Sequence, residues 1–231
     1  MIPVLAQTGF EQIWDWEVAW DFLPIVARGM FLVTLPATFL GITIAVILGL
    51  FLSLLRRSPI RPIRWVTGFV VEFVRSTPLL VQLFFLFYVL PNFGVRMSAF
   101  TTLVVGLAVH YGAYTSESYR AGIESVAKGQ WEASVALNLS TATKWGRVIL
   151  PQAIPTVIPA LGNYLVAMVK DAPLGVSIGV IGVLGAAVAE ASQNFRFVEA
   201  YTLVGMLFLA VSIPLAIFAR YLETRYGYER T

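Results

Sequence analysis

The chain has 231 residues, of which 58% are hydrophobic and only 13% are charged, and its mean hydropathy is +0.79. A soluble fold cannot bury that much apolar surface in one core beneath a polar shell, so the composition indicates a membrane protein. The absence of cysteine excludes disulfide scaffolds and thiolate metal sites, and a single histidine, His110, excludes a multi-histidine metal centre. The net charge of +3 arises from basic residues spread between apolar segments, which indicates membrane topology rather than nucleic-acid binding.

The N-terminal segment alternates aromatic and acidic residues. Within residues 10–21 these are Trp14, Trp16, Trp20, Glu11, Asp15, Glu17 and Asp21. Such a mixture suits the membrane–water interface on the outer side, where acidic residues are tolerated. The first residues lack a basic region and a proper apolar stretch, so we expect no cleaved signal peptide. We therefore predict that residues 1–25 form an extracytoplasmic segment.

Residues 26–55 form the first predicted membrane span. At ~1.5 Å per residue, a helix of this length crosses an apolar layer of ~30 Å with some tilt. Four arginines and two prolines follow it within nine residues: Arg56, Arg57, Pro59, Arg61, Pro62 and Arg64. Short arginine-rich loops stay in the cytoplasm, so this turn predicts a chain whose N-terminus is outside.

Four further segments are predicted to span the membrane. They are residues 65–89, 99–119, 154–169 and 200–219. Residues 173–189 are also apolar, but a crossing there would place the last arginines (Arg220, Arg225 and Arg230) outside. We therefore predict that this glycine-rich segment forms short, closely packed helices or a re-entrant piece. The sequence thus predicts an all-α membrane protein, one domain over residues 1–231, with five transmembrane helices and a cytoplasmic C-terminus.

Between the third and fourth spans lies a polar loop, residues 120–153, which we place in the cytoplasm. The sequence predicts a short helix from Trp131 to about Leu137. It stops at Asn138, because asparagine tolerates the left-handed conformation. A second helix begins after a Ser140 cap and is expected to end before Pro151. Its apolar face consists of Trp145, Val148 and Ile149, flanked by Lys144 and Arg147. One side can therefore pack while the other stays in water.

Polar residues inside the second span mark a candidate pathway. Glu72 and Arg75 are three residues apart and can pair on one helix face, because an unpaired charge at the bilayer centre costs ~2.5–3.5 kcal/mol. Pro78 follows Thr77 and removes the hydrogen bond that the Val74 carbonyl would accept, which predicts a kink and a free acceptor. A structural ion pair beside a packing kink and a direct substrate role both fit this pattern.

A second polar stripe lies on the third span, where His110, Tyr114 and Glu117 share one helix face. The stripe is predicted to face the pathway, although a membrane histidine more often bonds between helices and Glu117 can pair with Arg120. After the fourth span, Lys170-Asp171-Ala172-Pro173 combines two charges with a proline, which predicts a broken helix that acts as a gate. The alternative is a surface turn. Thr77 and Asn163 complete the pathway candidates.

The polar loop also carries a family resemblance. Glu132-Ala133-Ser134, three residues, Asn138, nine residues and Val148-Ile149-Leu150-Pro151 resemble the loop signature of bacterial ABC importer permeases, E-A-A, three residues, G, nine residues, I-x-L-P. Ser134, Asn138 and Val148 depart from it by small replacements. Residues 71–83, 120–133 and 151–153, with Lys170-Asp171, are similar to the polar amino acid branch of these permeases, and within it to permeases for ectoine and hydroxyectoine. Ala172-Pro173 stands where that branch usually has Thr-Ser.

The resemblance implies a permease subunit of an ATP-driven importer in the bacterial inner membrane. Its partners would be a second permease subunit, identical or a paralogue, two cytoplasmic ATPases and an extracytoplasmic solute-binding protein. No enzyme activity or cofactor is expected in this chain, because ATP and magnesium would bind the ATPases. The polar loop would couple the two parts through Trp131, Glu132, Ala133, Ser134, Asn138, Lys144, Leu150 and Pro151.

Other classes of protein fit the sequence less well. A secondary transporter or a channel would also contain broken helices, but it needs no helical loop with this spacing. A membrane-embedded enzyme needs clustered catalytic groups, and one histidine with scattered carboxylates is a poor set. A DNA-reading helix-turn-helix is disfavoured because Pro151 and the following span tie the second helix to lipid.

Overall fold

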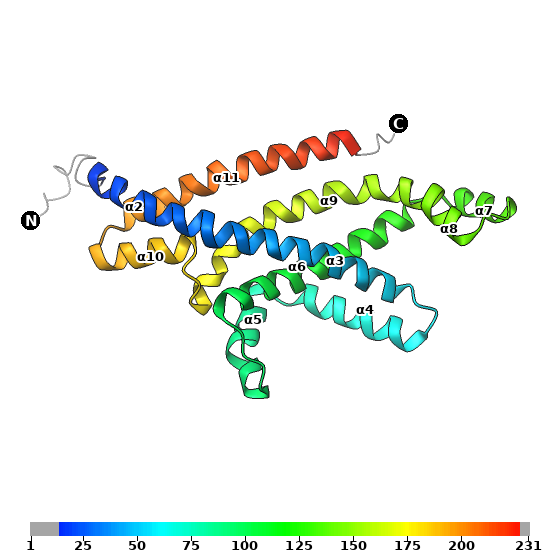
Figure 1. Cartoon of the computed structure of the whole chain (residues 1–231), viewed down its shortest axis with the longest axis horizontal. Helices are drawn as coiled ribbons and strands as arrows, with labels where there is room; N and C mark the ends of the chain where they lie inside the picture. The colour runs from blue at the N-terminus through cyan, green and yellow to red at the C-terminus, as the bar shows by residue number, and fades with distance from the viewer. Residues whose placement is uncertain (1–13, 227–231) are drawn as a thin grey trace, which may run out of the picture.

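The computed structural model describes residues 14–226, and all regular structure in that range is helical. Figure 1 shows long helical rods that run roughly along the long axis of the molecule, while α5 leaves them at a steep angle. The first, third, fourth and fifth predicted membrane spans lie in these rods. The bounds and packing of the helices explain how the polar residues come together.

The first rod is one continuous helix made of α2 (Trp16–Arg28), a π-helical turn η1 (Gly29–Thr34) and α3 (Leu35–Arg56). Asp15 caps it, since its carboxylate accepts hydrogen bonds from the backbone of Glu17 and Val18. The first helix therefore begins ten residues earlier than predicted. Residues 16–25 belong to it and are not a separate N-terminal segment, while residues 1–13 lie outside the described range.

The second predicted span is broken. It consists of α4 (Arg61–Ser76), α5 (Leu79–Phe84), a π-helical turn η2 (Phe85–Val89) and a 3-10 turn η3 (Leu90–Phe93). The axes of its two halves differ by 107°, with the break at Thr77 and Pro78. The kink predicted at Pro78 within the second span is confirmed.

The third rod, α6 (Ala99–Glu124), lies against α3, α4 and α9 and is capped by Ser98. It leads into the polar loop, which contains α7 (Lys128–Ala136), α8 (Thr141–Thr143) and a π-helical turn η4 (Lys144–Ile149). Asn138 is left-handed, with φ of 50°, and Ser140 accepts a hydrogen bond from the Thr143 backbone. Both predicted helix boundaries are therefore confirmed.

The predicted helix end before Pro151 is wrong. The helix passes from η4 directly into α9 (Leu150–Asp171). The reason is the wide π turn, in which the Leu150 backbone N–H donates to the Trp145 carbonyl, five residues back. The same arrangement precedes Pro36 and Pro91, because Leu35 donates to Met30 and Leu90 to Phe85. A wider turn before each proline lets the helix continue past a residue that cannot donate.

The segment after α9 folds into a 3-10 helix, η5 (Ala172–Ile178), and a short helix, α10 (Val183–Asn194). Short, closely packed helices were predicted here, and the packing confirms them. A Cβ on Gly29 would lie 2.7 Å from the Gly182 carbonyl oxygen, and the Val183 backbone N–H donates to Thr34 Oγ1 at 3.0 Å. The last helix, α11 (Phe197–Tyr226), packs on α9, α10 and α2.

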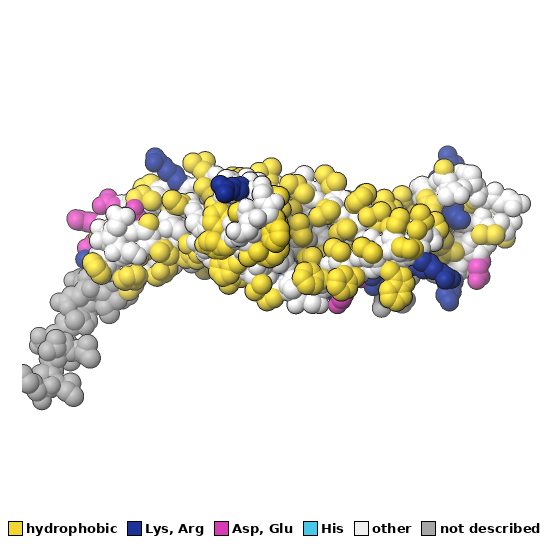
Figure 2. Space-filling model, turned by 90° about the horizontal axis from the view of Figure 1, so that it is seen from below, with side chains coloured by type: hydrophobic (Ala, Val, Ile, Leu, Met, Phe, Trp, Pro, Cys, Tyr) yellow, Lys and Arg dark blue, Asp and Glu magenta, His cyan; other side chains and the backbone are white. Residues whose placement is uncertain are grey.

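Three described helices are long and apolar enough to cross a membrane: residues 16–56, 141–178 and 197–226. The bent pair α4–α5 is a fourth if its halves count as one span. Large apolar side chains are widely exposed along these rods, for example Ile47 at 65% and Leu32 at 69%. Figure 2 shows a broad hydrophobic band on one face and a group of Lys and Arg side chains at the end that carries the polar loop. These surfaces suit a protein surrounded by lipid.

Candidate functional site

The polar stripe on α6 meets the C-terminal ends of α3 and α4. Glu117 forms ion pairs with Arg56 of α3 and with Arg120, whose Nη2 lies 2.7 Å from Oε2 of Glu117. The Arg75 guanidinium of α4 lies 4.0 Å from the same carboxylate, which is only 16% exposed. The predicted Glu117–Arg120 pair is present. The contact with Arg56, 61 residues away in the chain, gave no signal in the sequence.

The predicted pair of Glu72 and Arg75 is long. Its closest atoms are 3.5 Å apart, and 71% of the Glu72 side chain is exposed. Arg75 instead lies over the ring of Tyr114, with its guanidinium carbon 5.3 Å from the ring centre. The Tyr114 hydroxyl donates to the Arg75 carbonyl oxygen at 3.3 Å. The two polar stripes predicted on the second and third spans therefore meet, but through Arg75 rather than through Glu72.

The kink at Pro78 does not leave a free carbonyl. Gln82 Nε2 donates to the Val74 carbonyl oxygen at 2.8 Å and also contacts the Thr77 hydroxyl at 2.8 Å. The Thr77 hydroxyl donates to the same Val74 oxygen at 3.1 Å. The expectation of a free acceptor at Val74 is therefore wrong, because a side chain from the next helix covers it. Gln82 lies within residues 71–83, which carry the family resemblance, and its spacing from Val74 gives no other signal.

An aromatic cluster continues the stripe. His110 lies between Tyr111 and Tyr114, with ring centres 5.4 and 5.2 Å apart, and Tyr164 of α9 packs against both tyrosines. Nδ1 of His110 is buried and has no hydrogen-bond partner among the described residues. The Tyr164 hydroxyl bonds Ser118 at 3.0 Å. Sequence reasoning missed Tyr111 and Tyr164, since both lie off the polar stripe in apolar surroundings.

The gate candidates point in different directions. The Asp171 carboxylate accepts a 2.7 Å hydrogen bond from the Tyr111 hydroxyl, which places it beside the aromatic cluster. Lys170 is exposed and lines a mostly apolar groove of about 570 Å³ with Pro173 and residues of α11. Asn163 is exposed seven residues before Lys170, on the same face of α9. The structure therefore brings Asp171 to the cluster and leaves Lys170 and Asn163 away from it.

The polar loop folds around a small core of its own. Ile123, Val126, Ile149 and Ala153 are buried there, with Trp131, Trp145 and Val148 packed against them. The rings of Trp131 and Trp145 meet edge to face at 5.4 Å, and Ser134 is buried with its hydroxyl bonded to the Gln130 carbonyl. This core holds the two helices of the loop together as one rigid unit.

The outer surface of the loop is exposed. Glu132 and Ala133 lie there, as do Val135 at 66% and Leu137 at 71% exposure. Lys144 is half-buried, whereas Leu150 and Pro151 are exposed where η4 meets α9. In Figure 1 the loop forms the far end of the molecule, beyond α3 and α4. Arg57, just after α3, lies over the ring of Trp145 at 5.3 Å, so the arginine-rich turn and the loop share that end.

Residues 41–228 match the family of binding-protein-dependent transport system inner membrane components. The chain belongs to this family. A probable amino-acid ABC transporter permease, y4tG of Sinorhizobium fredii, is 42% identical over 203 residues, which are 88% of this chain and 87% of that one. The L-cystine transport permease TcyB of Bacillus subtilis is 42% identical over 71% of this chain and 70% of its own length.

Solved structures of transporters share the fold of this inner membrane component. A crystal structure titled as an amino acid ABC transporter with histidines matches 92% of this chain and 99% of its own with 35% identity and a TM-score of 0.86. The inward-facing MetNI methionine ABC transporter matches 89% of this chain and 94% of its own with 18% identity and a TM-score of 0.59, which shows the fold alone. Among the described residues, no group of three His, Cys, Asp or Glu side chains could hold a metal ion.

Proposed function

We propose that this inner membrane component is the permease subunit of an ABC importer that moves a polar amino acid, or an amino-acid-like compatible solute such as ectoine or hydroxyectoine, into the cell. The names of its relatives support a substrate of amino acid type. It would cross the bilayer five times, with its N-terminus outside and its C-terminus in the cytoplasm. A second permease subunit, two ATPases that bind ATP and magnesium, and an extracytoplasmic binding protein complete the proposed complex.

The polar loop carries the proposal. Its two helices share a core, protrude from the rods and expose the Glu132 carboxylate next to the apolar side chains of Val135 and Leu137. An exposed apolar patch on a polar loop marks a contact with another protein, and a rigid helical unit transmits a displacement better than a flexible chain. We infer that Glu132 meets a basic group in a cleft of the ATPase.

The polar residues behind the loop suit a route that opens to either side in turn. Glu117 of α6 joins the C-terminal ends of α3 and α4, while Tyr111 contacts Asp171 at the end of α9 and Tyr114 contacts Arg75 before the bend of α4–α5. The helix continues from α9 through η5, so the break predicted at Lys170–Pro173 is wrong. His110 belongs to the same cluster, and its Nδ1, which is buried without a hydrogen-bond partner among residues 14–226, can bond a polar solute. Closure of the ATPases can shift the equilibrium between the inward-open and outward-open states only through contacts that differ between those two states.

One experiment tests coupling and substrate together. Proteoliposomes that hold the complex, with ATP inside and binding protein outside, are assayed for uptake of labelled ectoine, glutamine, arginine and cystine. We expect the unmodified complex to take up one class of these solutes. Glu132→Lys should abolish that uptake, because it opposes the proposed basic group, while Glu132→Gln should lower it partly. Gly129→Ala, in the same loop, changes no charge and is the control.

Three outcomes would overturn parts of the proposal. Full ATP-driven uptake by the Glu132→Lys complex would remove the docking role of the polar loop. Uptake of arginine or glutamine without uptake of ectoine would remove the compatible solute from the proposed substrates. Uptake that needs no ATP would favour a secondary transporter instead. Each result is read at matched amounts of inserted protein, so a failure to insert is not mistaken for a failure to couple.

A further inference from the structure

A basic pocket lies where α3, α4 and α6 meet at the polar-loop end of the molecule. Its volume is about 410 Å³, and it is lined by Arg56, Arg57, Arg64, Gly68, Arg120 and Glu124. Five of the six lining residues are charged, and four of them are arginines. The lining comes from three separate helical segments, so the fold itself assembles this concentration of charge.

The positive charge of the pocket is only partly neutralised. Arg56 and Arg120 share Glu117, and Arg120 also contacts Glu124 at 2.7 Å. Within residues 14–226, no carboxylate lies within 4 Å of Arg57 or Arg64, the other two arginines of the lining. Two guanidinium groups in one pocket without carboxylate partners favour an anion with several oxygen acceptors, such as a phosphate.

The two arginines are held in place by other contacts. Arg64 Nη1 donates to the Ser58 carbonyl oxygen at 3.3 Å, within the turn between α3 and α4. Arg57 lies over the Trp145 ring at 5.3 Å, which ties it to the polar loop. Neither contact removes charge, and both reduce the side-chain entropy that binding an anion would cost. The pocket is therefore partly organised for an anion.

The helix that supplies Arg64 and Gly68 to the pocket, α4, also exposes large apolar side chains. Trp65 and Phe69 of α4 are 77% and 72% exposed, and they flank Gly68 in the sequence. A Cβ placed on Gly68 would have no heavy atom within 4 Å, so the space above this glycine is open. A free inorganic phosphate gains nothing from such aromatic and open apolar surface, whereas the acyl chains of a lipid can pack against it.

We propose that this pocket binds the phosphate headgroup of an anionic phospholipid from the cytoplasmic leaflet, with its acyl chains against the exposed face of α4. The proposal rests on the orientation given under the proposed function, because the pocket must lie at the inner surface of the membrane. Basic pockets between membrane helices on that side are suited to anionic headgroups, and each arginine near the surface contributes about 1 kcal/mol.

The test measures lipid retained by the purified complex, without ATP or substrate. The complex is exchanged into nanodiscs of phosphatidylcholine with one part in five of phosphatidylglycerol, and bound lipid is counted by native mass spectrometry. The double variant Arg57→Gln, Arg64→Gln should bind phosphatidylglycerol about thirtyfold more weakly. Gly68→Leu should block binding as well, since it fills the pocket and leaves every charge in place.

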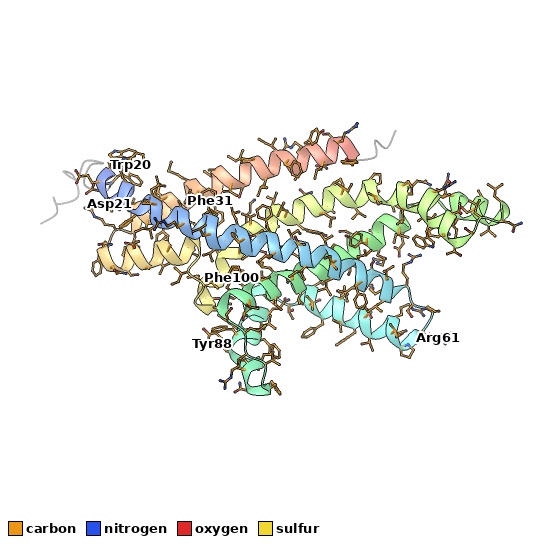
Figure 3. All side chains as sticks on the ribbon, in the orientation of Figure 1. Trp20, Asp21, Phe31, Arg61, Tyr88 and Phe100 are labelled. Carbon is orange, nitrogen blue, oxygen red and sulfur yellow. The ribbon has the colours of Figure 1, made fainter. Side chains whose placement is uncertain are left out.

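Two control variants match these changes. Arg61, labelled at the α3–α4 turn in Figure 3, lies outside the lining, so Arg61→Gln removes a neighbouring charge and should retain the lipid. Gly205→Leu adds the same side chain at another open helix position, on α11, and should also retain it. Loss of lipid in all four variants would overturn the proposal, because the effect would then be general.

Other outcomes separate the competing ligands. Displacement of phosphatidylglycerol by millimolar inorganic phosphate would overturn the lipid and leave a site for a free anion. Unchanged lipid binding with loss of the ATPase from the double variant would assign the arginines to an acidic surface of that subunit. Because the assay needs no transport, normal lipid binding in a complex without uptake would count against the proposed function alone.

Discussion

Two irregular points in the described helices contact α6 in different ways. The break between α4 and α5 faces Tyr114, whose hydroxyl donates to the backbone carbonyl of Arg75 at 3.3 Å. The second point, called the second break although the helix continues through it, is the change from α-helix to 3-10 helix between α9 and η5. It faces Tyr111, whose hydroxyl donates to the carboxylate of Asp171 at 2.7 Å. Two tyrosines, three residues apart on one helix, thus contact both breaks. The bond from Tyr114 is long and is accepted by a neutral carbonyl, whereas the bond from Tyr111 is short and is accepted by a carboxylate.

The breaks also differ in their local hydrogen bonds. At the first, Gln82 and Thr77 bond the Val74 carbonyl, so residues within eight positions of one another satisfy the bend. At the second, Ala172 keeps a helical conformation, with φ of −55° and ψ of −32°, and the chain tightens into a 3-10 turn. The bend at Pro78 is therefore stabilised by hydrogen bonds within its own segment. The segment at Pro173 is held by the contact of Asp171 with α6. Substitutions on α6 should act mainly on the second break.

Tyr111→Phe should have the largest effect of the substitutions at the breaks. It removes a hydrogen bond to a charged group, a loss of about 1.5–3 kcal/mol, and it does so at a residue that is only 5% exposed. We expect the unfolding temperature of the purified complex to fall by about 3–12 °C. ATP-driven uptake in proteoliposomes should fall with it, since Asp171 loses its partner on α6.

Tyr114→Phe is the matched control for this change. It removes the same atom from the same helix, but the lost bond is neutral and 3.3 Å long, so about 0.5–1.5 kcal/mol is expected. Its shift in unfolding temperature should be less than half that of Tyr111→Phe. Equal shifts for the two variants would remove the distinction between the breaks.

Two glycines allow the breaks to be compared without side-chain contacts. Gly94 ends the 3-10 turn η3 beyond the first break, with φ of 86°, and Gly179 ends η5 beyond the second, with φ of 83°. A Cβ would meet no heavy atom within 4 Å at either position. Alanine at each should therefore cost only backbone strain, about 1–2 kcal/mol. Thermal unfolding should show two equal decreases, of about 2–6 °C. A larger decrease at Gly179 would mean that the second segment tolerates less local strain than its contacts imply.

The local features of these segments could be predicted from the sequence. Asn138, Ser140 and Pro78 each act through the conformation or hydrogen bonding of their own backbone, so the helix boundaries at 138–140 and the kink at 78 required no knowledge of neighbours. The apolar face of Trp145, Val148 and Ile149 followed from helical spacing and packs as predicted. Features of this kind can be predicted from a single sequence, because they depend only on residues that are close together in the chain.

Contacts between distant segments could not be predicted in the same way. Nothing in the sequence joins Arg56 to Glu117 or Tyr111 to Asp171, because spacing says which residues share a helix face and not which helix lies opposite. Pro151 shows a second limit. Proline is expected to end a helix, but a π turn before it lets the helix continue, and this depends on a hydrogen-bond shift that residue types alone do not reveal.

Gln82→Leu should have the smallest effect. The variant removes the donor that reaches the Val74 carbonyl at 2.8 Å, yet the Thr77 hydroxyl still donates to that oxygen at 3.1 Å. The carbonyl keeps a partner, so the cost should stay near the low end of about 0.5–1.5 kcal/mol. We expect the unfolding temperature to fall by about 1–3 °C.

Uptake per folded complex should be unchanged in this variant, since Pro78 still prevents a straight helix and the remaining bonds are local. Gln193→Leu, at an exposed position of α10, controls for the loss of an amide and should change neither quantity. A loss of uptake in Gln82→Leu that exceeds its loss of folded protein would show that the first break depends on this side chain for transport. The bend between α4 and α5 would then depend on Gln82 for its role in transport, as the second break depends on Tyr111. The two breaks would differ only in the residue that stabilises each.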